Sequence, residues 1–260
     1  APAVLQLVDE GRVSLDDDGT RYLDFKIALA PDHARVTLRR LLSHQAGFAD
    51  RIGGIGTSGE PTSLAAFLLT RTQPRLRQDG DVVAYANYNA ALAARVVERI
   101  SRQPFEEYVA QHLFGPLGMT RTTAVQPAPS SLQVSSGYGR AEAPPARVSM
   151  AADPILEVGS TGVVAPAADM ARLLRALLDG SPGVISRRAL DQMMSPQAPV
   201  PRGFMGLGMY APLGMGGNPF TGHDGGTGAF QSVVALLPRA RLGLFASYNS
   251  DGVPEALSPT

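Results

Sequence analysis

A glycine-rich segment with one histidine lies late in the 260-residue chain, where residues 221–228 read Thr-Gly-His-Asp-Gly-Gly-Thr-Gly. Apolar runs at residues 232–237 and 242–246 follow it and predict β-strands. Glycines allow a backbone to come close to another group. The segment could therefore be an edge strand that lies along a substrate and offers it backbone N–H groups and the imidazole of His223. A glycine-rich hairpin entry with an incidental histidine explains the same residues.

A second candidate pattern is Tyr85-Ala86-Asn87, which lies between the turn residues Asp79-Gly80 and a predicted helix. Asn87 has a sufficient structural reason if it caps that helix, and Tyr85 could be a packing residue. In the functional interpretation both side chains point into one cleft. The amide of Asn87 then holds a substrate carbonyl, and the phenol of Tyr85 relays a proton if its pKa is lowered.

Two other patterns predict no cofactor and no metal. Residues 54–59 match G-x-G-x-x-G, but no predicted strand precedes them and Glu60-Pro61 interrupts a helix start, so we interpret them as a flexible loop. The sequence has no cysteine, and its four histidines form no H-E-x-x-H motif and have no close carboxylate partner. We interpret His44, at the end of a predicted helix, as a structural, hydrogen-bonded residue.

Composition excludes several classes of partner. Lys+Arg and Asp+Glu are equal at 23 each, so no basic field attracts nucleic acid or an anionic membrane. No apolar run approaches the roughly 18–20 residues of a membrane span. The 44% hydrophobic content predicts a sizeable core in one large domain or two intimate subdomains.

Apolar periodicity predicts a mixed α/β protein, with helices first and strands mainly after Thr221. The residues 126–145 are predicted to be a long loop, and residues 199–219 a loop or irregular strand. Helices are expected at Val4–Val8, after the caps Thr37 and Ser63, from Asn87 to Ile100, from Pro104 to Leu113, from Pro166 to Leu178, and from the cap Ser186 to Met194.

The motifs, taken together and in order, resemble the class C β-lactamase-like serine hydrolases, which include D-alanyl-D-alanine peptidases and β-lactamase-like esterases. The resemblance covers essentially the whole chain. It rests on the segments Ala3–Asp17, Val36–Phe48, Tyr85-Ala86-Asn87, Pro116–Met119, Gly159-Ser160-Thr161-Gly162, Ala168–Ala171 and Gly222–Gly226.

This resemblance implies an α/β (α+β) fold in which an antiparallel sheet is flanked by helices and joined to a mainly helical subdomain. About residues 1–12 and 159–260 would form the sheet-bearing subdomain, and about 13–158 the helical one, with the site in the cleft between them. The fold would be N-terminally truncated, because the chain begins inside a predicted helix. The resemblance suggests a periplasmic or secreted location, whereas the residues leave the compartment, a cytoplasmic one included, and the oligomeric state open.

The family pattern also implies roles for five residues. Tyr85 would transfer a proton, Asn87 would contact the substrate amide, and His223 would take the basic position of a Lys/His-Thr-Gly motif. Gly225 would let the acyl group lie against the strand. The backbone N–H of Gly226 would be one half of an oxyanion hole.

Two departures from the family pattern affect the expected activity. Asp224 replaces Thr or Ser, and its carboxylate should repel an anionic substrate group or pair with His223 or an arginine, which favours neutral esters or amides over penicillins. The S-x-x-K motif is absent, because the only lysine is Lys26 and Leu23 stands three residues before it. We expect a serine hydrolase of a small ester, amide, peptide or β-lactam whose nucleophile precedes Ala1. The alternative is a non-catalytic binding or regulatory member.

Overall fold

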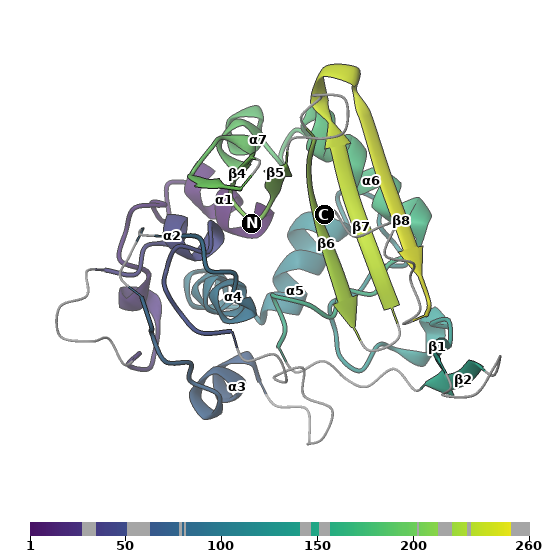
Figure 1. The fold of residues 1–260 in the computed structure, drawn as a ribbon, viewed down its shortest axis with the longest axis horizontal. Helices are drawn as coiled ribbons and strands as arrows, with labels where there is room; N and C mark the ends of the chain where they lie inside the picture. Colours follow the sequence, from purple (N-terminus) through teal and green to yellow (C-terminus); the bar gives the residue numbers. More distant parts are fainter. Residues whose placement is uncertain are drawn as a thin grey trace.

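The computed structural model describes residues 1–27, 35–50, 63–77, 80, 82–140, 147–150, 157–201, 203–212, 220–227 and 230–250. A six-stranded sheet stands beside a group of helices that comes mainly from the first half of the chain (Figure 1). The predicted combination of helices and an antiparallel sheet is confirmed.

Helices account for most of the regular structure before residue 195. They are α1 (Pro2–Asp9), α2 (Leu38–Leu42), α3 (Leu64–Thr70), α4 (Asn87–Ser101), α5 (Phe105–Val109), α6 (Ala167–Asp179) and α7 (Arg187–Met194). Short 3₁₀ or π turns are η1 (Gly19–Tyr22), η2 (Ala110–Phe114), η3 (Ser130–Leu132) and η5 (Pro238–Ala240).

Three predicted helix caps are confirmed. The hydroxyls of Thr37, Ser63 and Ser186 each accept a hydrogen bond from the backbone N–H three residues on, at 3.2, 3.3 and 2.9 Å. Each cap satisfies one of the backbone donors that a helix start leaves without an intrahelical partner. These helix starts therefore follow from local chemistry alone.

The predicted cap at Asn87 is wrong. Helix α4 begins at Asn87 itself, and the residue at the cap position is Ala86, whose backbone is extended and which offers no side-chain acceptor. Asn87 is thus a helical residue whose amide is directed to another partner. Pro104 likewise is the residue before α5 rather than its first helical residue.

The sheet has the order β3-β4-β5-β6-β7-β8, and every neighbouring pair is antiparallel. Its strands are β3 (Ala198–Val200), β4 (Gly203–Met205), β5 (Tyr210–Pro212), β6 (Thr221–Thr227), β7 (Phe230–Leu237) and β8 (Leu242–Tyr248). Strands thus begin before Thr221, and β3 to β5 give definite structure to part of the segment predicted as loop or irregular strand.

The prediction of a loop throughout residues 126–145 is also wrong. This segment contains η3 and the strand β1 (Gly137–Arg140), which pairs with β2 (Arg147–Met150) in a separate two-stranded sheet. Such short strands depend on their pairing partners more than on their own residues, so local propensity missed them.

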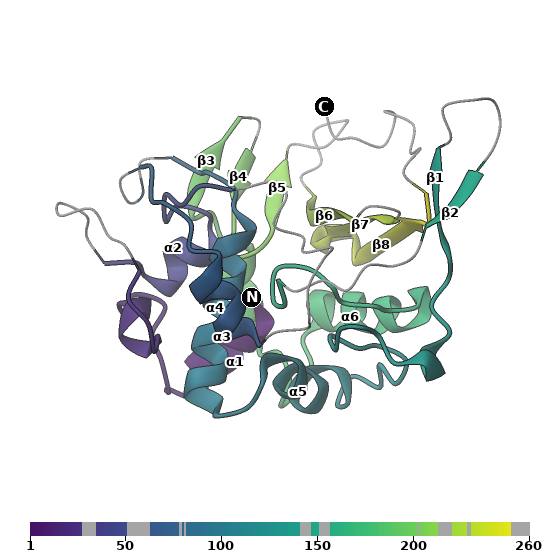
Figure 2. The same ribbon diagram turned by 90° about the horizontal axis from the view of Figure 1, so that it is seen from below.

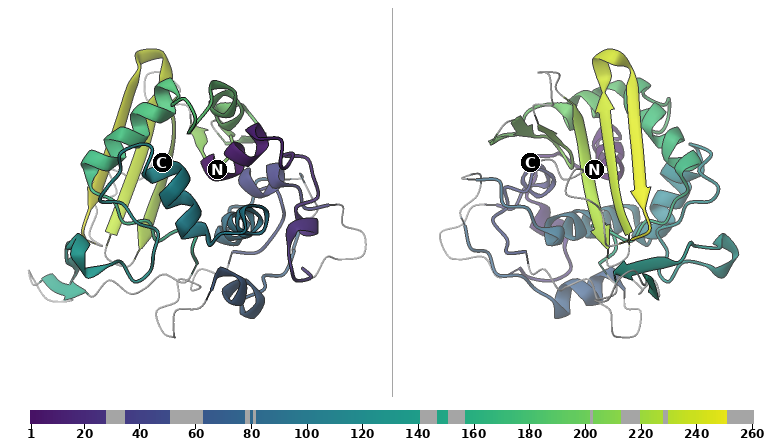
Figure 3. Two further views of the ribbon diagram at one scale, coloured as in Figure 1. Left: turned by 180° about the vertical axis from the view of Figure 1, so that it is seen from behind. Right: turned by 45° about the vertical axis from the view of Figure 1, so that its right-hand side comes forward.

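One face of the sheet is covered by α6, as the views from below and from behind show (Figures 2 and 3). A glycine on β8 favours this close approach. A Cβ atom added at Gly243 would lie 3.1 Å from the Cβ of Leu174 on α6. Leu174 and Leu177 are buried in this contact region of the core, as the predicted apolar stripe of α6 requires.

Helix α1 packs against α4 and α7. Leu5 and Leu7 are almost fully buried, and the side-chain amide of Gln6 donates to the backbone carbonyls of His112 and Val184, both at 2.8 Å. Within the described residues no helix is long and apolar enough to cross a membrane.

Candidate active site

The predicted Tyr85–Asn87 pair is formed at the N-terminal end of α4. The hydroxyl of Tyr85 donates to Oδ1 of Asn87 at 3.0 Å, and the backbone N–H of Asn87 donates to Oδ1 of Asp50 at 3.3 Å. Tyr85 is 45% exposed, so its ring has a solvent-facing side. The phenol and the amide therefore share one local site, held at the start of a long helix.

His44 lies directly behind this pair. It is 4% exposed, and its ring centroid is 4.3 Å from that of Tyr85. Its Nδ1 accepts a hydrogen bond from the backbone N–H of Ala86 at 3.3 Å. The prediction that His44 is hydrogen-bonded is confirmed.

His223 lies on β6 and faces the same region. Its ring centroid is 6.0 Å from that of Tyr85 and 5.6 Å from that of Tyr210 on β5. The two motifs singled out in the sequence are therefore brought together by the fold. Nδ1 of His223 lies against the backbone carbonyl of Asp224. A carbonyl can only accept, so Nδ1 would be the donor in this contact.

One edge of β6 is largely unpaired within the described residues. Strand β7 pairs with β6 along its whole length, from Thr221 to Thr227, whereas β5 pairs only at Tyr210 opposite Gly222. Along an antiparallel edge, alternate residues direct their N–H and C=O groups outward. The segment from His223 to Thr227 thus presents backbone donors and acceptors on its β5 side, as the edge-strand interpretation predicts.

The glycines of β6 differ in their surroundings. A Cβ atom at Gly225 would have no described atom within 4 Å, whereas one at Gly222 would lie 2.2 Å from the carbonyl oxygen of Val234. At Gly226 the nearest atom would be Oε1 of Gln231, at 2.4 Å. Folding therefore explains the glycine at Gly222, but nothing in the described fold requires one at Gly225.

Asp224 has a partner that was not predicted from the sequence. Its carboxylate was expected to repel an anionic substrate group or to pair with His223 or an arginine. In the structure it accepts a hydrogen bond from the hydroxyl of Tyr210, and the repulsion stays a prediction. Tyr210 on β5 stands opposite Gly222 on β6, and Gly222 lies two residues before Asp224 on the same strand. Because side chains two apart on a strand share a face, this diagonal contact depends on the sheet register and leaves no local sequence signal.

Carboxylates set the electrostatics around Tyr85. Burial raises the pKa of Tyr85 above its ordinary value, and the carboxylates of Asp50, Asp224 and Glu157 raise it further because they oppose a phenolate. The described surroundings therefore do not supply the lowered pKa on which the proton-relay hypothesis depends. At neutral pH the phenol keeps its proton and donates it to Asn87.

Glu157 is the most perturbed carboxyl group of this region. It is 6% exposed, and burial together with Asp50 raises its pKa to about 7. The sequence interpretation missed Glu157, Asp50 and Tyr210. Only Glu157 could have been noticed in the sequence, because it lies two residues before the motif Gly159-Ser160-Thr161-Gly162. Asp50 and Tyr210 reach the site through tertiary contacts.

Two serines inside the chain could be nucleophiles by residue type. Ser43 has no base beside it in the described residues, whereas the side chain of Ser160 hydrogen-bonds to the carboxyl group of Glu157. The hydroxyl of Ser43 donates to the backbone carbonyl of Arg39 at 2.8 Å, and that of Ser160 to the backbone carbonyl of Glu157 at 2.9 Å. The Ser43 hydroxyl also lies 2.8 Å from Oε1 of Gln45, an amide oxygen that is not a general base. Both hydroxyls are thus bonded to the local backbone, and neither position carries a sequence signal for catalysis.

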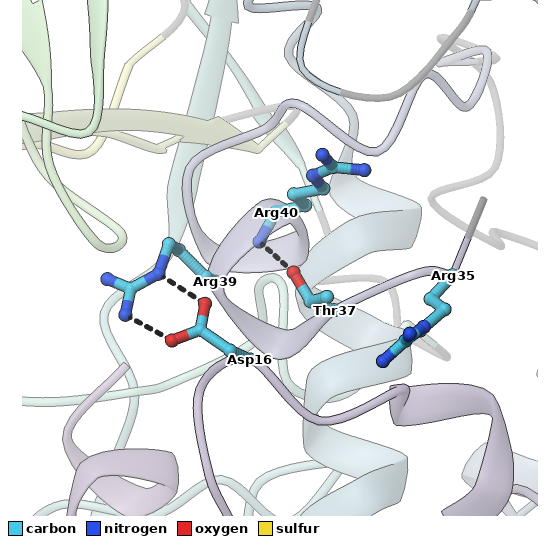
Figure 4. A pocket seen from close by; sticks show the side chains of 5 residues that line it. All are labelled: Asp16, Arg35, Thr37, Arg39 and Arg40. Atoms are coloured by element: carbon cyan, nitrogen blue, oxygen red, sulfur yellow. Dashed lines mark hydrogen bonds and ion pairs between the residues drawn. The ribbon is translucent and has the colours of Figure 1, made fainter.

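Other potential sites lie elsewhere. His112 stacks on Tyr108, with ring centroids 4.4 Å apart, and His33 and residues 54–59 are outside the described residues. The described residues contain no group of three or more His, Cys, Asp or Glu side chains that could hold a metal. A pocket of about 340 Å³ contains none of the predicted site residues; it is lined by Asp16, Arg35, Thr37, Arg39 and Arg40 (Figure 4).

Sequence comparison finds relatives that are named as penicillin-binding proteins, which agrees with the family that the motifs resemble. The chain is 27% identical over 214 residues to a Bacillus subtilis (strain 168) protein named as penicillin-binding protein PbpX, covering 82% of this chain and 51% of that protein. It is 27% identical over 260 residues to penicillin-binding protein 4 of Amycolatopsis lactamdurans, covering 92% and 66% of the two chains. The chain therefore spans between half and two thirds of the length of these relatives.

The fold is similar to solved structures. An octameric penicillin-binding protein homologue from Pyrococcus abyssi matches with a TM-score of 0.83 at 22% identity, covering 98% of this chain and 60% of that one. A D-stereospecific amidohydrolase from Streptomyces sp. matches with a TM-score of 0.77 at 21% identity, covering 96% and 79%. The beta-lactamase family model matches residues 1–258. The chain therefore belongs to the beta-lactamase family.

Proposed function

We propose that this chain forms most of a serine hydrolase that acts through an acyl-enzyme on an ester, amide, peptide or β-lactam. The observation that carries the proposal is the meeting of Tyr85 and His223, whose ring centroids lie 6.0 Å apart. One residue precedes a long helix, and the other lies on a strand whose β5-side edge is largely unpaired within the described residues. The substrate would lie beside these two residues, with polar side chains on one side and backbone donors on the other.

Asn87 and Gly226 are proposed to bind the reacting group. The hydroxyl of Tyr85 occupies Oδ1 of Asn87, so the amide Nδ2 is the atom that would donate to a substrate carbonyl. The backbone N–H of Gly226 would donate to the oxyanion that develops on the attacked carbonyl. Loss of one such donor typically slows an enzyme by about 10²–10³-fold.

The proposed role of Tyr85 requires a nearby cation. Its raised pKa favours the neutral phenol, which can donate a proton to a leaving group but is a poor base. The ammonium group of an S-x-x-K lysine would oppose the surrounding carboxylates and lower this pKa. The 260 residues contain no S-x-x-K motif, so the proposal places the serine and lysine upstream of Ala1.

The site favours substrates without a negative charge next to β6. Asp224 and Glu157 both act on the Tyr85 hydroxyl, and an anionic substrate group there would be repelled. A neutral ester or amide meets no such penalty. The structural similarity to an amidohydrolase agrees with this preference but does not by itself assign a substrate.

A non-catalytic binding protein with the same cleft is the second candidate. The observation in its favour is the absence of S-x-x-K from these 260 residues. In this alternative the Tyr85–Asn87 pair and the edge of β6 would bind a ligand without attacking it.

Covalent labelling of the full-length protein, including the encoded residues upstream of Ala1, separates the two candidates. The folded protein is incubated with a fluorophosphonate or a labelled penicillin, and intact mass and peptide mapping locate any adduct. We expect an adduct on a serine three residues before a lysine. If folded full-length protein forms no adduct with either reagent and hydrolyses none of a panel of esters and amides, catalysis is refuted.

A further inference from the structure

We propose that His44 is a positioning residue that holds Tyr85 in its working orientation by binding the backbone on both sides of it. This inference rests on the proposed function, because it assigns His44 a part in the same reaction. His44 itself would touch neither the substrate nor the reacting atoms.

His44 accepts two hydrogen bonds from the backbone on either side of Tyr85, and we call this arrangement the clamp. The backbone carbonyl of His44 accepts from the N–H of Ala84 at 2.8 Å, and its side-chain Nδ1 accepts from the N–H of Ala86 at 3.3 Å. Tyr85 lies between these two points. Its ring also contacts the imidazole, with 4.3 Å between the ring centroids. The chain on either side of Tyr85 is thus fixed to one buried residue.

The backbone conformation of His44 explains how one residue can bond both the N–H of Ala84 and the N–H of Ala86. His44 follows α2 and has a φ of 54°, in the left-handed region that is uncommon for residues other than glycine and in which asparagine, aspartate and histidine are enriched. This reversal turns the carbonyl and the side chain toward the same segment. The conformation is costly for an ordinary residue, and here it is held by the bonds that end α2 and by those to the Tyr85 segment.

The clamp works only if Nδ1 is unprotonated. A backbone N–H can only donate, so the bond from Ala86 requires a lone pair on Nδ1 and places the ring proton on Nε2. Burial, with a further contribution from the neighbouring His223, lowers the pKa of His44 to about 4. The ring is therefore neutral at physiological pH, and the acceptor is present throughout that range.

His44 also reaches the first turn of α4. Nδ2 of Asn89, a fully buried residue, lies 3.3 Å from the same Nδ1. One acceptor thus meets donors from the Tyr85 segment and from the helix that carries Asn87. Any buried imidazole needs hydrogen-bond partners, so the informative point is which groups supply them. Here both donors belong to the segment and the helix that carry Tyr85 and Asn87, and this choice of partners points to a role in orienting that pair.

A matched pair of substitutions tests this role in the full-length protein. His44→Asn places a carboxamide oxygen near the position of Nδ1 and tolerates a positive φ. His44→Gln carries the same group one bond farther out, where it cannot replace Nδ1. We expect His44→Gln to lower kcat at least ~10-fold with little change in KM, because misplacing a catalytic group by about 1 Å can cost up to 10²-fold. His44→Asn should restore kcat to within a few-fold of the wild type.

Two measurements on the same variants do not depend on turnover. Proton–nitrogen correlation spectra of the imidazole should show the proton of His44 on Nε2, and spectra of ring-labelled tyrosine should show a shift of the Tyr85 signal that is larger in His44→Gln than in His44→Asn. Tyr85→Phe identifies that signal. Circular dichroism checks that each variant is folded.

The results distinguish failure of this inference from failure of the proposed function. Absence of turnover and of a serine adduct in the wild type refutes the hydrolase, and the spectra still test the clamp. Equal kcat and equal Tyr85 signals in folded His44→Gln and wild-type protein overturn the clamp, as does a proton on Nδ1 of His44. If His44→Gln does not fold, equal loss of kcat in folded His44→Asn and His44→Ala overturns it.

Discussion

Substitution of Gly225 by alanine separates the demands of folding from those of the reaction. Side chains two apart on a strand share a face, so a methyl group at Gly225 would project on the face of His223, whose ring is directed toward Tyr85. No described atom lies within 4 Å of that methyl group. It would therefore enter the space in which the acyl group of a substrate is proposed to lie.

The expected magnitudes for Gly225→Ala follow from this geometry. Stability should be unchanged or should rise by about 0.4–1 kcal/mol, because alanine restricts the unfolded chain. An extra carbon in a closely packed contact typically costs about 1–3 kcal/mol. If that cost falls on the transition state, kcat/KM should decrease roughly 5- to 150-fold.

The assay compares ester or amide hydrolysis and urea unfolding for wild-type and Gly225→Ala full-length protein. Gly222→Ala is the matched control, because its methyl group would lie 2.2 Å from the carbonyl oxygen of Val234 and should destabilise the sheet. Unchanged kcat/KM in a folded Gly225→Ala variant would show that no substrate lies against this face. A large loss of stability in that variant would show that the space is occupied by the protein itself.

Three further substitutions test the electrostatics of the molecule. Tyr85→Phe should lower kcat at least ~10²-fold if the phenol transfers the proton, with little change in the unfolding midpoint; near-normal turnover would end that assignment. The folded protein binds the proton of Glu157 more tightly than the unfolded chain does, since burial raises its pKa to about 7. Stability should therefore decrease as pH rises from about 4.5 to 7, by an amount on the order of 3 kcal/mol at most, and Glu157→Gln should abolish this decrease in urea unfolding series at pH 5 and pH 8. Asp16 accepts two hydrogen bonds from Arg39, at 2.7 and 2.8 Å, and this partner lowers the pKa of Asp16. The ion pair therefore stabilises the folded protein at pH values above the ordinary carboxyl pKa. This stabilisation is lost as the pH falls through the lowered pKa of Asp16 in the folded protein. Because the Asp16 side chain is 65% exposed, Asp16→Asn should cost only about 0.2–1 kcal/mol at pH 7, and a cost that did not shrink in 1 M salt would contradict a solvent-screened pair.

The sequence was informative where a residue acts on its near neighbours. The caps Thr37, Ser63 and Ser186 were predicted and are present, because a cap bonds a backbone group three residues away. The apolar stripe of α6 was predicted for the same reason, since helical periodicity is local. Asn87 shows the limit of such local reasoning. An asparagine near a helix start fits the capping rule, and the sequence does not tell whether its side chain caps the helix or, as here, bonds Tyr85.

The site shows the same division. The order of the motifs indicated the family and placed Tyr85 and His223 in one cleft, and the two rings do lie close together. The sequence did not reveal that Asp224 accepts from Tyr210, because that contact depends on how β5 and β6 are aligned. It also did not reveal that carboxylates raise the pKa of Tyr85, because Asp50, Glu157 and Asp224 come from three distant segments.

The sequence by itself determined the three capped helix starts, the family and the residue types available for chemistry, because each of these depends on short-range patterns or on motif order. Only the tertiary structure decided which edge of β6 is largely unpaired among the described residues, which glycine of β6 has no described atom near its Cβ position, and which histidine contacts the Tyr85 segment. These properties are set by contacts between residues far apart in the chain. Burial and electrostatic interactions depend on distance in space, and separation along the sequence does not predict that distance.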